Sequence, residues 1–315
     1  MFQSLIKLIR RRRIWARLRN RDWTEAFLQY SCWPEHVSID AQTELLTFGD
    51  SGLCLDKTQA HLLPFQTLAK NLAAHGACFE RNSAGQAVVT INNLHFLVQI
   101  DQDLAFLNDV FYQGSYNIRL PRTNKKRIVW DIGMNVGFAS LFFARDEDIE
   151  AVFGYEPFPK TFQEAEANFA LNPVYRSKIN AINKGIGDKD ETLSIGYKTE
   201  IRGNLSALED LSSGALNGQR ETVVIETATA ALREILERYP EREIIVKMDC
   251  EGGEHKILPA LDQSGLLSVI TALMIEWHGE GTSNLEEILT ANNFILFSTL
   301  SSPNVLGYIY AVHTN

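Results

Sequence analysis

The sequence predicts an α/β protein whose main domain contains a doubly wound sheet, preceded by a smaller α+β region. A strand, a glycine turn and a helix follow one another over residues 128–144. From there to the end of the chain, short apolar runs typical of buried strands alternate with segments of helical periodicity. Strands that alternate with helices form open sheets, and such sheets bind ligands at the carboxyl ends of their strands.

The charge of the chain is unevenly distributed. Its 315 residues carry a formal net charge of −9. Eight of the 30 basic residues precede the first acidic residue, Asp22: Lys7, Arg10, Arg11, Arg12, Arg13, Arg17, Arg19 and Arg21. The other 22 basic residues stand against 39 acidic ones, so residues 22–315 carry a charge of about −17. A body this acidic disfavours nucleic acid as a partner.

The cysteines and the apolar runs predict a cytoplasmic protein. The four cysteines are scattered without a C-x-x-C pair, which favours a reducing compartment and argues against a disulfide framework or a zinc site. No apolar run approaches the roughly 18 residues of a transmembrane helix. Arg10–Arg13 interrupts any signal-peptide core.

Residues 1–30 are expected to form a basic helical segment. Its apolar residues fall into two groups on roughly opposite faces, first Phe2, Leu5, Ile6 and Ile9, then Ile14, Trp15 and Leu18. Two interpretations stay open. The segment can lie peripherally on the anionic inner face of a membrane, or it can be a solvated helix that docks on the protein by one stripe.

Residues 31–125 are predicted to form a small α+β lead-in, with a substrate lid as one interpretation. The predicted elements are a helix at 56–74 that breaks at Pro64, a hairpin at 87–100 that turns at Asn92-Asn93, and a helix at 101–111. Pro121–Arg127 is the best boundary, so the main domain is expected at 126–315.

Strands and helices are predicted in alternation after the glycine turn. The expected strands are 151–156, 179–186, 243–248, 269–276, 294–298 and 305–312. The expected helices are 158–171, 229–239 and 283–293. An inserted hairpin is expected from residues 193–197 and 223–226, joined by the polar stretch 199–220. This order is what a doubly wound sheet requires.

The glycine turn itself limits the ligand. Asp131 ends an apolar strand, and Gly133 and Gly137 bracket a turn of little side-chain bulk around Asn135. The spacing matches neither the dinucleotide fingerprint nor a P-loop. An acidic residue before the turn suits a cationic or amino-acid-bearing ligand, which points towards S-adenosylmethionine. A turn in an ordinary α/β protein is the other interpretation.

Further charged side chains follow other predicted strands. Glu156 ends the second strand, where a carboxylate can accept both hydroxyls of an adenosine ribose, and Asp188 follows the third, where it can accept from an adenine amino group. The apolar run before Lys247 ends in Lys247-Met-Asp-Cys-Glu-Gly-Gly-Glu254, and unpaired charges near a core cost several kcal/mol. Glu276 and His278 share one side of the next strand.

This ordered set resembles the FkbM-type S-adenosylmethionine-dependent methyltransferases. The matching motifs are Asp-x-Gly-x-Asn-x-Gly at 131–137, Glu156-Pro157, Gly187-Asp188, Lys247-x-Asp-x-Glu-Gly-x-Glu254 and Glu276-x-His278, with Gly114-x-Tyr116 before them. The resemblance spans roughly residues 103–280. Met134, Cys250 and Gly253 depart from the residues common in the family, but none of them replaces a charged residue.

The resemblance implies a fold, a cofactor and a reaction. The fold would be a seven-stranded Rossmann-like sheet of the class I methyltransferases, with an antiparallel last strand. S-adenosylmethionine would be held by Asp131, Gly133, Asn135 and Gly137 at its methionine end, by Glu156 at the ribose and by Asp188 at the adenine. The acceptor would be a hydroxyl, often on a sugar of a glycan, glycolipid or glycosylated natural product.

The expected catalytic group consists of Lys247, Asp249, Glu276 and His278. Because the acceptor hydroxyl must lose its proton as the new bond forms, a general base is needed, and His278 has the most suitable ordinary pKa. Glu276 would orient its ring, and Asp249 is the competing base. No metal is predicted, although Asp249, Glu251, Glu276 and His278 together offer ligands for a divalent ion that lowers the pKa of the hydroxyl.

Two other function classes share some of these features. A base methyltransferase would share the fold, but the chain lacks an Asn/Asp-Pro-Pro-Tyr/Phe tetrapeptide and a Pro-Cys or Thr-Cys nucleophile. A non-catalytic module that binds S-adenosylmethionine, or a scaffold of glycan assembly, stays an alternative, as does a non-sugar acceptor. The sequence predicts no oligomeric state.

Overall fold

The computed structural model describes residues 2–99, 101–196, 220–279, 281–302 and 306–314. The chain divides into two compact units, Met1–Gly114 and Ser115–Asn315. Residues 115–121 belong with the second unit, since Tyr310 donates to the Ser115 carbonyl and Arg127 donates to the Pro121 carbonyl. The compact units therefore divide before the predicted boundary at 121–127, while the three-part division at 30 and 125 stays a prediction.

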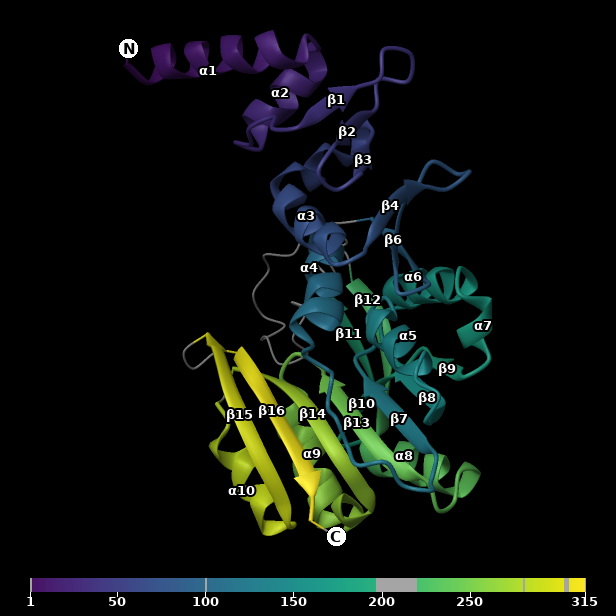
Figure 1. Ribbon diagram of the computed structural model, residues 1–315. Coiled ribbons are helices and arrows are strands. Elements are labelled where there is room, and N and C mark those ends of the chain that lie inside the picture. The colour runs from purple at the N-terminus through teal and green to yellow at the C-terminus, as the bar shows by residue number, and fades with distance from the viewer. Residues whose placement is uncertain (1, 100, 197–219, 280, 303–305, 315) are drawn as a thin grey trace. The chain divides into compact units, whose positions relative to one another are not determined.

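The second unit contains the predicted seven-stranded sheet (Figure 1), with the strand order β15-β16-β14-β13-β7-β8-β9. Five neighbouring strands run parallel, whereas β16 runs antiparallel to both β14 and β15. The predicted fold class with its antiparallel last strand is confirmed. The strands are β7 (Arg127–Ile132), β8 (Ile149–Tyr155), β9 (Ile179–Ile182), β13 (Glu243–Asp249), β14 (Ile270–His278), β15 (Phe294–Ser302) and β16 (Leu306–His313).

Helices cover both faces of this sheet. On one face, Ile128, Trp130 and Ile132 of β7 join a buried cluster with residues of α8 (Ala228–Arg238), α9 (Glu254–Gln263) and α10 (Ser283–Ala291). Helix α5 (Phe138–Ala144) contacts β7, β8 and α6 (Pro159–Ala170) but contributes nothing to that cluster, which places it on the opposite face. All six residues of β7 are buried, as expected for a central strand between two helical layers.

The predicted strand at 179–186 is wrong in one respect, because it forms two strands in two sheets. After β9, the Asn183 side chain donates to the carbonyls of Glu156 and Pro157 and ends the pairing with β8. Residues Gly185–Gly187 then form β10 of a second sheet, of order β10-β12-β11. Its strands β11 (Glu191–Gly196) and β12 (Arg220–Thr227) form the predicted antiparallel hairpin. Tyr197 and residues 199–219 of that prediction lie outside the described residues.

The remaining short elements are α7 (Pro173–Arg176) and the 3-10 turn η3 (Leu266–Val269). Helix α9 was not predicted, because its first residue belongs to an acidic motif and Pro259 lies inside it. No helix in the described part of the chain is both long and apolar enough to cross a bilayer.

The first unit begins with two helices where one was predicted. Helix α1 (Phe2–Leu18) ends before Arg19, whose φ of 48° is left-handed, and Asn20 accepts from the Trp23 backbone to cap α2 (Arg21–Gln29). The predicted grouping of Ile14 with Trp15 is also wrong. Ile14 is fully buried, whereas Trp15 is 47% exposed, because residues 100° apart on a helix meet different surroundings.

Short strands and helices complete this unit. They are β1 (Val37–Ile39), β2 (Leu46–Phe48), β3 (Cys54–Leu55), η1 (Lys57–Phe65), α3 (Gln66–Ala74), β4 (Cys78–Arg81), β5 (Ala87–Ile91), β6 (Leu94–Val98), α4 (Asp101–Asn108) and the π-helical η2 (Asp109–Gln113). The predicted break at Pro64 separates the 3-10 segment from α3. The predicted hairpin turns at Asn92 and Asn93, which have φ values of 52° and 65°.

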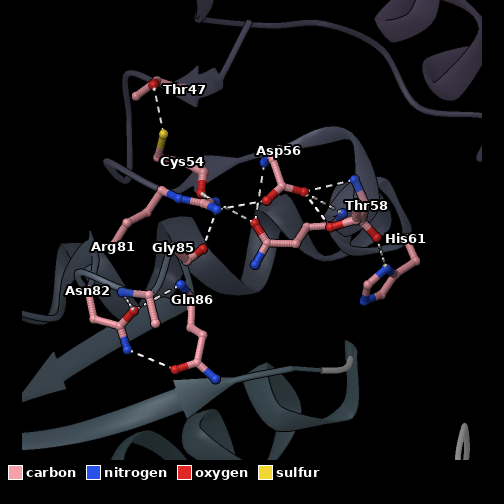
Figure 2. A network of polar contacts seen from close by, with 11 residues as sticks. Thr47, Cys54, Asp56, Thr58, His61, Arg81, Asn82, Gly85 and Gln86 are labelled. Atoms are coloured by element: carbon pink, nitrogen blue, oxygen red, sulfur yellow. Dashed lines mark hydrogen bonds and ion pairs between the residues drawn. The ribbon is translucent and has the colours of Figure 1, made fainter. Parts of the chain in front are cut away.

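Arg81 joins these small elements (Figure 2). Its guanidinium donates to Asp56 at 2.7 Å, to Gln59 at 2.6 Å and to the Cys54 and Gly85 carbonyls. Asp56 in turn caps η1 through the Thr58 and Gln59 backbones. Because hydrogen bonds to charged groups contribute roughly 1.5–3 kcal/mol, this one side chain stabilises a unit that has only short strands.

Candidate functional site

The turn between β7 and α5 is shaped by close backbone approaches. The Gly133 and Met134 backbones donate to the Tyr155 carbonyl at 3.0 and 2.9 Å, which fastens the turn to the end of β8. Gly133 and Gly137 have φ values of 75° and 81°, which favour glycine. A Cβ on Gly133 would lie 1.8 Å from the Asp249 carbonyl oxygen, so the turn and the end of β13 touch.

A buried ion pair lies beneath this turn. Lys247 on β13 and Asp131 on β7 are register partners, and the ammonium lies 3.1 Å from Asp131 Oδ1. Asp131 has no exposed surface, and its other oxygen accepts from the Ser140 hydroxyl at 2.6 Å. Burial alone would lower the pKa of Lys247, but the charges of Asp131 and Asp249 outweigh it and raise the pKa, so the ammonium stays charged. Asp131 therefore joins the strand before the turn to the helix after it, and to β13.

Glu156 stands just beyond the end of β8 and bonds to the backbone of the same turn. Its carboxylate accepts from the Asn135 backbone at 3.1 Å and from the Phe158 backbone at 3.0 Å. Burial raises the pKa of Glu156 to about 7, although these two hydrogen bonds oppose the shift. The predicted carboxylate thus lies directly beside Asn135 of the turn.

Two carboxylates from neighbouring strands meet at one tyrosine. Asp249 ends β13 and Glu276 lies opposite it on β14, as their register requires. The Tyr116 hydroxyl lies 3.2 Å from Asp249 and 2.9 Å from Glu276, and the Lys247 ammonium lies 5.3 Å from the centre of its ring. Burial, with the charge of Asp249, raises the pKa of Glu276 to about 7.

His278 lies at the end of β14 among further carboxylates. Its Nδ1 is 3.2 Å from the fully buried Glu254, and its Nε2 is 3.6 Å from Glu251. Burial would lower the pKa of this imidazole, but the hydrogen bond to Glu254 and the charges of Asp249 and Glu251 raise it to about 9. The ring partner of His278 is therefore Glu254, whereas the expected partner, Glu276, is bonded to Tyr116.

The structure brings most of the predicted site residues together. Asp131, Gly133, Asn135 and Glu156 surround one turn, and Lys247 links it to Asp249, whose side chain lies 3.7 Å from the ammonium. Asp188 stands apart, exposed after β10 of the smaller sheet, and among the described residues its side chain makes no hydrogen bond or ion pair to this group. The predicted roles of all these residues remain predictions.

Sequence reasoning missed the roles of Tyr116 and Glu254. Tyr116 precedes the predicted domain boundary and is 133 residues from Asp249 in the chain, so spacing gave no signal beyond the Gly114-x-Tyr116 match. Glu254 belongs to the acidic motif, but the sequence did not indicate that it opens α9 and contacts His278 of β14.

The same group offers ligands for a metal ion. One atom each from Asp249, Glu276 and His278 lie within 4.8 Å of one another, and oxygen with imidazole nitrogen suits several divalent ions. The Tyr116 hydroxyl already contacts both carboxylates. The absence of a metal from the reaction stays a prediction.

The contact between Gly133 and Asp249 gives a direct test of how tightly this site is packed. We expect Gly133→Ala to lower the free energy of unfolding by about 2–5 kcal/mol, since a left-handed backbone strains alanine and the new methyl group overlaps a carbonyl. Gly265→Ala is the matched control, because Gly265 has a φ of 71° and nothing within 4 Å of an added Cβ.

The control variant should lose only about 1–2 kcal/mol. Urea unfolding followed by tryptophan fluorescence measures both changes. Equal losses in the two variants would show that the turn does not touch the end of β13.

The chain is similar to known methyltransferases. Residues 131–296 match the model of the methyltransferase FkbM domain. Methyltransferase sdnD of Sordaria araneosa is 24% identical over 209 residues, which cover 59% of this chain and 80% of that protein.

The chain also matches solved structures at low sequence identity. A methyltransferase FkbM from Methylobacillus flagellatus KT is 15% identical with a TM-score of 0.41, and the match covers 64% of this chain but only 46% of that one. A putative tRNA (m1A22) methyltransferase from Streptococcus pneumoniae, solved in complex with S-adenosyl-L-methionine, is 14% identical with a TM-score of 0.36 and coverages of 60% and 66%. Because the family model spans more than half of the chain, this protein belongs to the FkbM methyltransferases, a family that uses S-adenosylmethionine.

Proposed function

We propose that this methyltransferase acts on a hydroxyl group of a sugar, in a glycan, a glycolipid or a glycosylated natural product. The observation that carries the proposal is the group of Tyr116, Asp249, Glu276 and His278 at the ends of β13 and β14, next to the turn after β7. These are proton-accepting and hydrogen-bonding side chains, which O-methylation requires.

The residues around the turn fit S-adenosylmethionine. Gly133 and Gly137 let the turn pack closely against the Asp249 carbonyl and the Phe169 ring. Among the described residues, Asn135 Oδ1 is buried without a hydrogen-bond partner, so it can accept from a ligand. Glu156 would accept from the ribose hydroxyls and Asp188 from the adenine, while Asp131 would act on the methionine end by holding the turn. Carboxylates in excess of cations suit a ligand with a sulfonium and an ammonium group. When bound, this cofactor supplies a methyl group that is already activated for transfer.

The chain's own residues would then align and deprotonate the acceptor. Glu254 holds Nδ1 of the His278 ring, which leaves Nε2 to take the hydroxyl proton. Asp249 is the competing base, since its side chain is 27% exposed beside Lys247. Lys247 and Glu276 would position these groups rather than exchange protons themselves.

Aromatic rings beside the carboxylates support a sugar acceptor. The rings of Tyr116 and Tyr308 lie 6.3 Å apart, and those of Tyr308 and Tyr310 are stacked at 6.2 Å. Sugars present hydroxyl groups at their edges and C–H groups on their faces. Carboxylates bind the first and aromatic rings pack on the second.

The proposal also includes the location of the protein in the cell. We propose a cytoplasmic protein that contacts the inner face of a membrane peripherally through residues 1–21, whose basic side chains would meet anionic lipid. A membrane-linked glycan acceptor would be compatible with that position.

The pH dependence of kcat/KM tests the role of His278. A general base acts when it is deprotonated, so we expect kcat/KM to rise with pH and to level off near the His278 pKa of about 9. His278→Ala should remove this rise and lower turnover by about 10²–10⁴-fold. Glu251→Gln should move the rise to lower pH, because it removes a carboxylate that raises the imidazole pKa.

The rates are measured by methyl transfer in the presence of EDTA. A pH rise that persists in His278→Ala would assign the base to another group, with Asp249 first. Turnover that EDTA abolishes would contradict the metal-free route.

The acceptor class is tested in the source cell. The glycans of cells with and without the protein are compared by mass spectrometry, and cells that express His278→Ala serve as the control. We expect one class of glycan or glycolipid to lose the mass of one methylene group per product molecule in both deficient strains. Unchanged glycans alongside a change in another hydroxylated metabolite would refute the sugar acceptor.

A further inference from the structure

A cavity of about 310 Å³ lies in the first unit between α1 and α2. It is lined by Arg11, Arg12, Trp15, Arg21, Thr24 and Glu25. We propose that this cavity binds the phosphate-bearing headgroup of an anionic membrane lipid and prefers a phosphomonoester to a phosphodiester. The inference deepens the membrane contact proposed above and does not depend on methyl transfer.

The charges around the cavity favour an anion. Three guanidinium groups face one carboxylate, and that carboxylate, Glu25, pairs with Arg11 and fixes its position. Within the part of the chain that the structure describes, the side chains of Arg12 and Arg21 make no hydrogen bond or ion pair. Guanidinium groups bind phosphate through two parallel hydrogen bonds, so these two can take a doubly charged phosphate.

The start of α2 adds a second attraction for an anion. Asn20 caps this nine-residue helix by accepting from the Trp23 backbone, and Arg21 is its first residue. The positive end of the helix dipole therefore lies beside the Arg21 side chain at the cavity.

An apolar edge next to the arginines points to a lipid as the source of the phosphate. Leu8, Arg11, Arg12 and Trp15 follow the i, i+3, i+4, i+7 spacing of a single helix face. Leu8 and Trp15 are both 47% exposed. Side chains that combine an apolar body with a basic end lie at the boundary between headgroups and acyl chains.

The opposite side of α1 holds the helix to the unit. Ile14 is fully buried, and Arg10 donates to the Cys32 carbonyl at 3.1 Å. Both residues lie roughly 200° around the helix from Arg12. Since α1 docks by that side, Leu8 and Trp15 stay half exposed, and Trp15 lines the cavity.

A specific cavity and a simple basic surface would differ in the lipids that they prefer. A surface attracts lipids according to their net charge, whereas paired guanidinium groups in a cavity recognise the geometry and second charge of a terminal phosphate. The volume exceeds that of a phosphate group alone and leaves room for the attached glycerol or sugar, beside the Trp15 ring.

Vesicle cosedimentation with the full-length protein tests this preference. One set of phosphatidylcholine vesicles contains phosphatidic acid, and the other contains phosphatidylglycerol at the same zeta potential. The cavity variant is Arg12→Gln with Arg21→Gln. The control is Arg13→Gln with Arg17→Gln, which removes the same charge from exposed arginines that do not line the cavity.

We expect the wild-type protein to prefer phosphatidic acid by at least about tenfold. The cavity variant should lose the preference. The control variant should bind both lipids more weakly but keep the ratio, and circular dichroism should show both variants folded.

Three results would overturn the proposal. Equal binding of the two lipids would leave only a general basic surface. Binding of glycerol 3-phosphate without binding of vesicles would assign the cavity to a soluble phosphate ester. No binding of any vesicle, with no difference on deleting residues 1–21, would remove the membrane contact as well, and methyl transfer would be judged by its own assay.

Discussion

The buried ion pair between Asp131 and Lys247 is the interaction on which the rest of the site depends. It joins the ends of two central strands, and neither side chain is exposed to solvent by more than 3%. Removing either partner would leave a buried charge, at a cost of about 3–5 kcal/mol. Lys247 also donates to the Gly133 carbonyl and lies 3.7 Å from Asp249, so a single cation links the turn after β7 to the acidic group.

Bringing these carboxylates together is energetically unfavourable, and this explains why their pKa values are raised. Asp249, Glu251, Glu254 and Glu276 stand around the basic side chains of Lys247 and His278. Burial and mutual repulsion raise the pKa of Glu251 to about 8 and that of Glu276 to about 7. A cationic ligand would relieve this repulsion, and the same carboxylates hold the imidazole of His278, the base of our proposal. In that proposal, ligand binding and proton transfer both depend on the same group of negative charges.

The sequence predicted which charged side chains come together but not which of them bond to each other. Carboxyl ends of parallel strands share one edge of a sheet, so Glu156, Asp249 and Glu276 were correctly expected to gather there. Which groups bond to each other depends on packing across long separations. Tyr116 bonds to Glu276, which is 160 residues away in the sequence. Glu254 contacts His278 from α9, a helix that was not predicted because it contains Pro259. Asp131 was expected to hold the methionine end of the cofactor, and spacing did not predict that it pairs with Lys247 and is buried.

Calorimetric titration of S-adenosylmethionine into the wild-type protein and Lys247→Met tests the central claim most directly. The account predicts one bound cofactor per wild-type chain and none, or binding weakened at least about a hundredfold, in a variant whose circular dichroism shows that it remains folded. A folded Lys247→Met protein that takes up the cofactor as tightly as the wild type would contradict it.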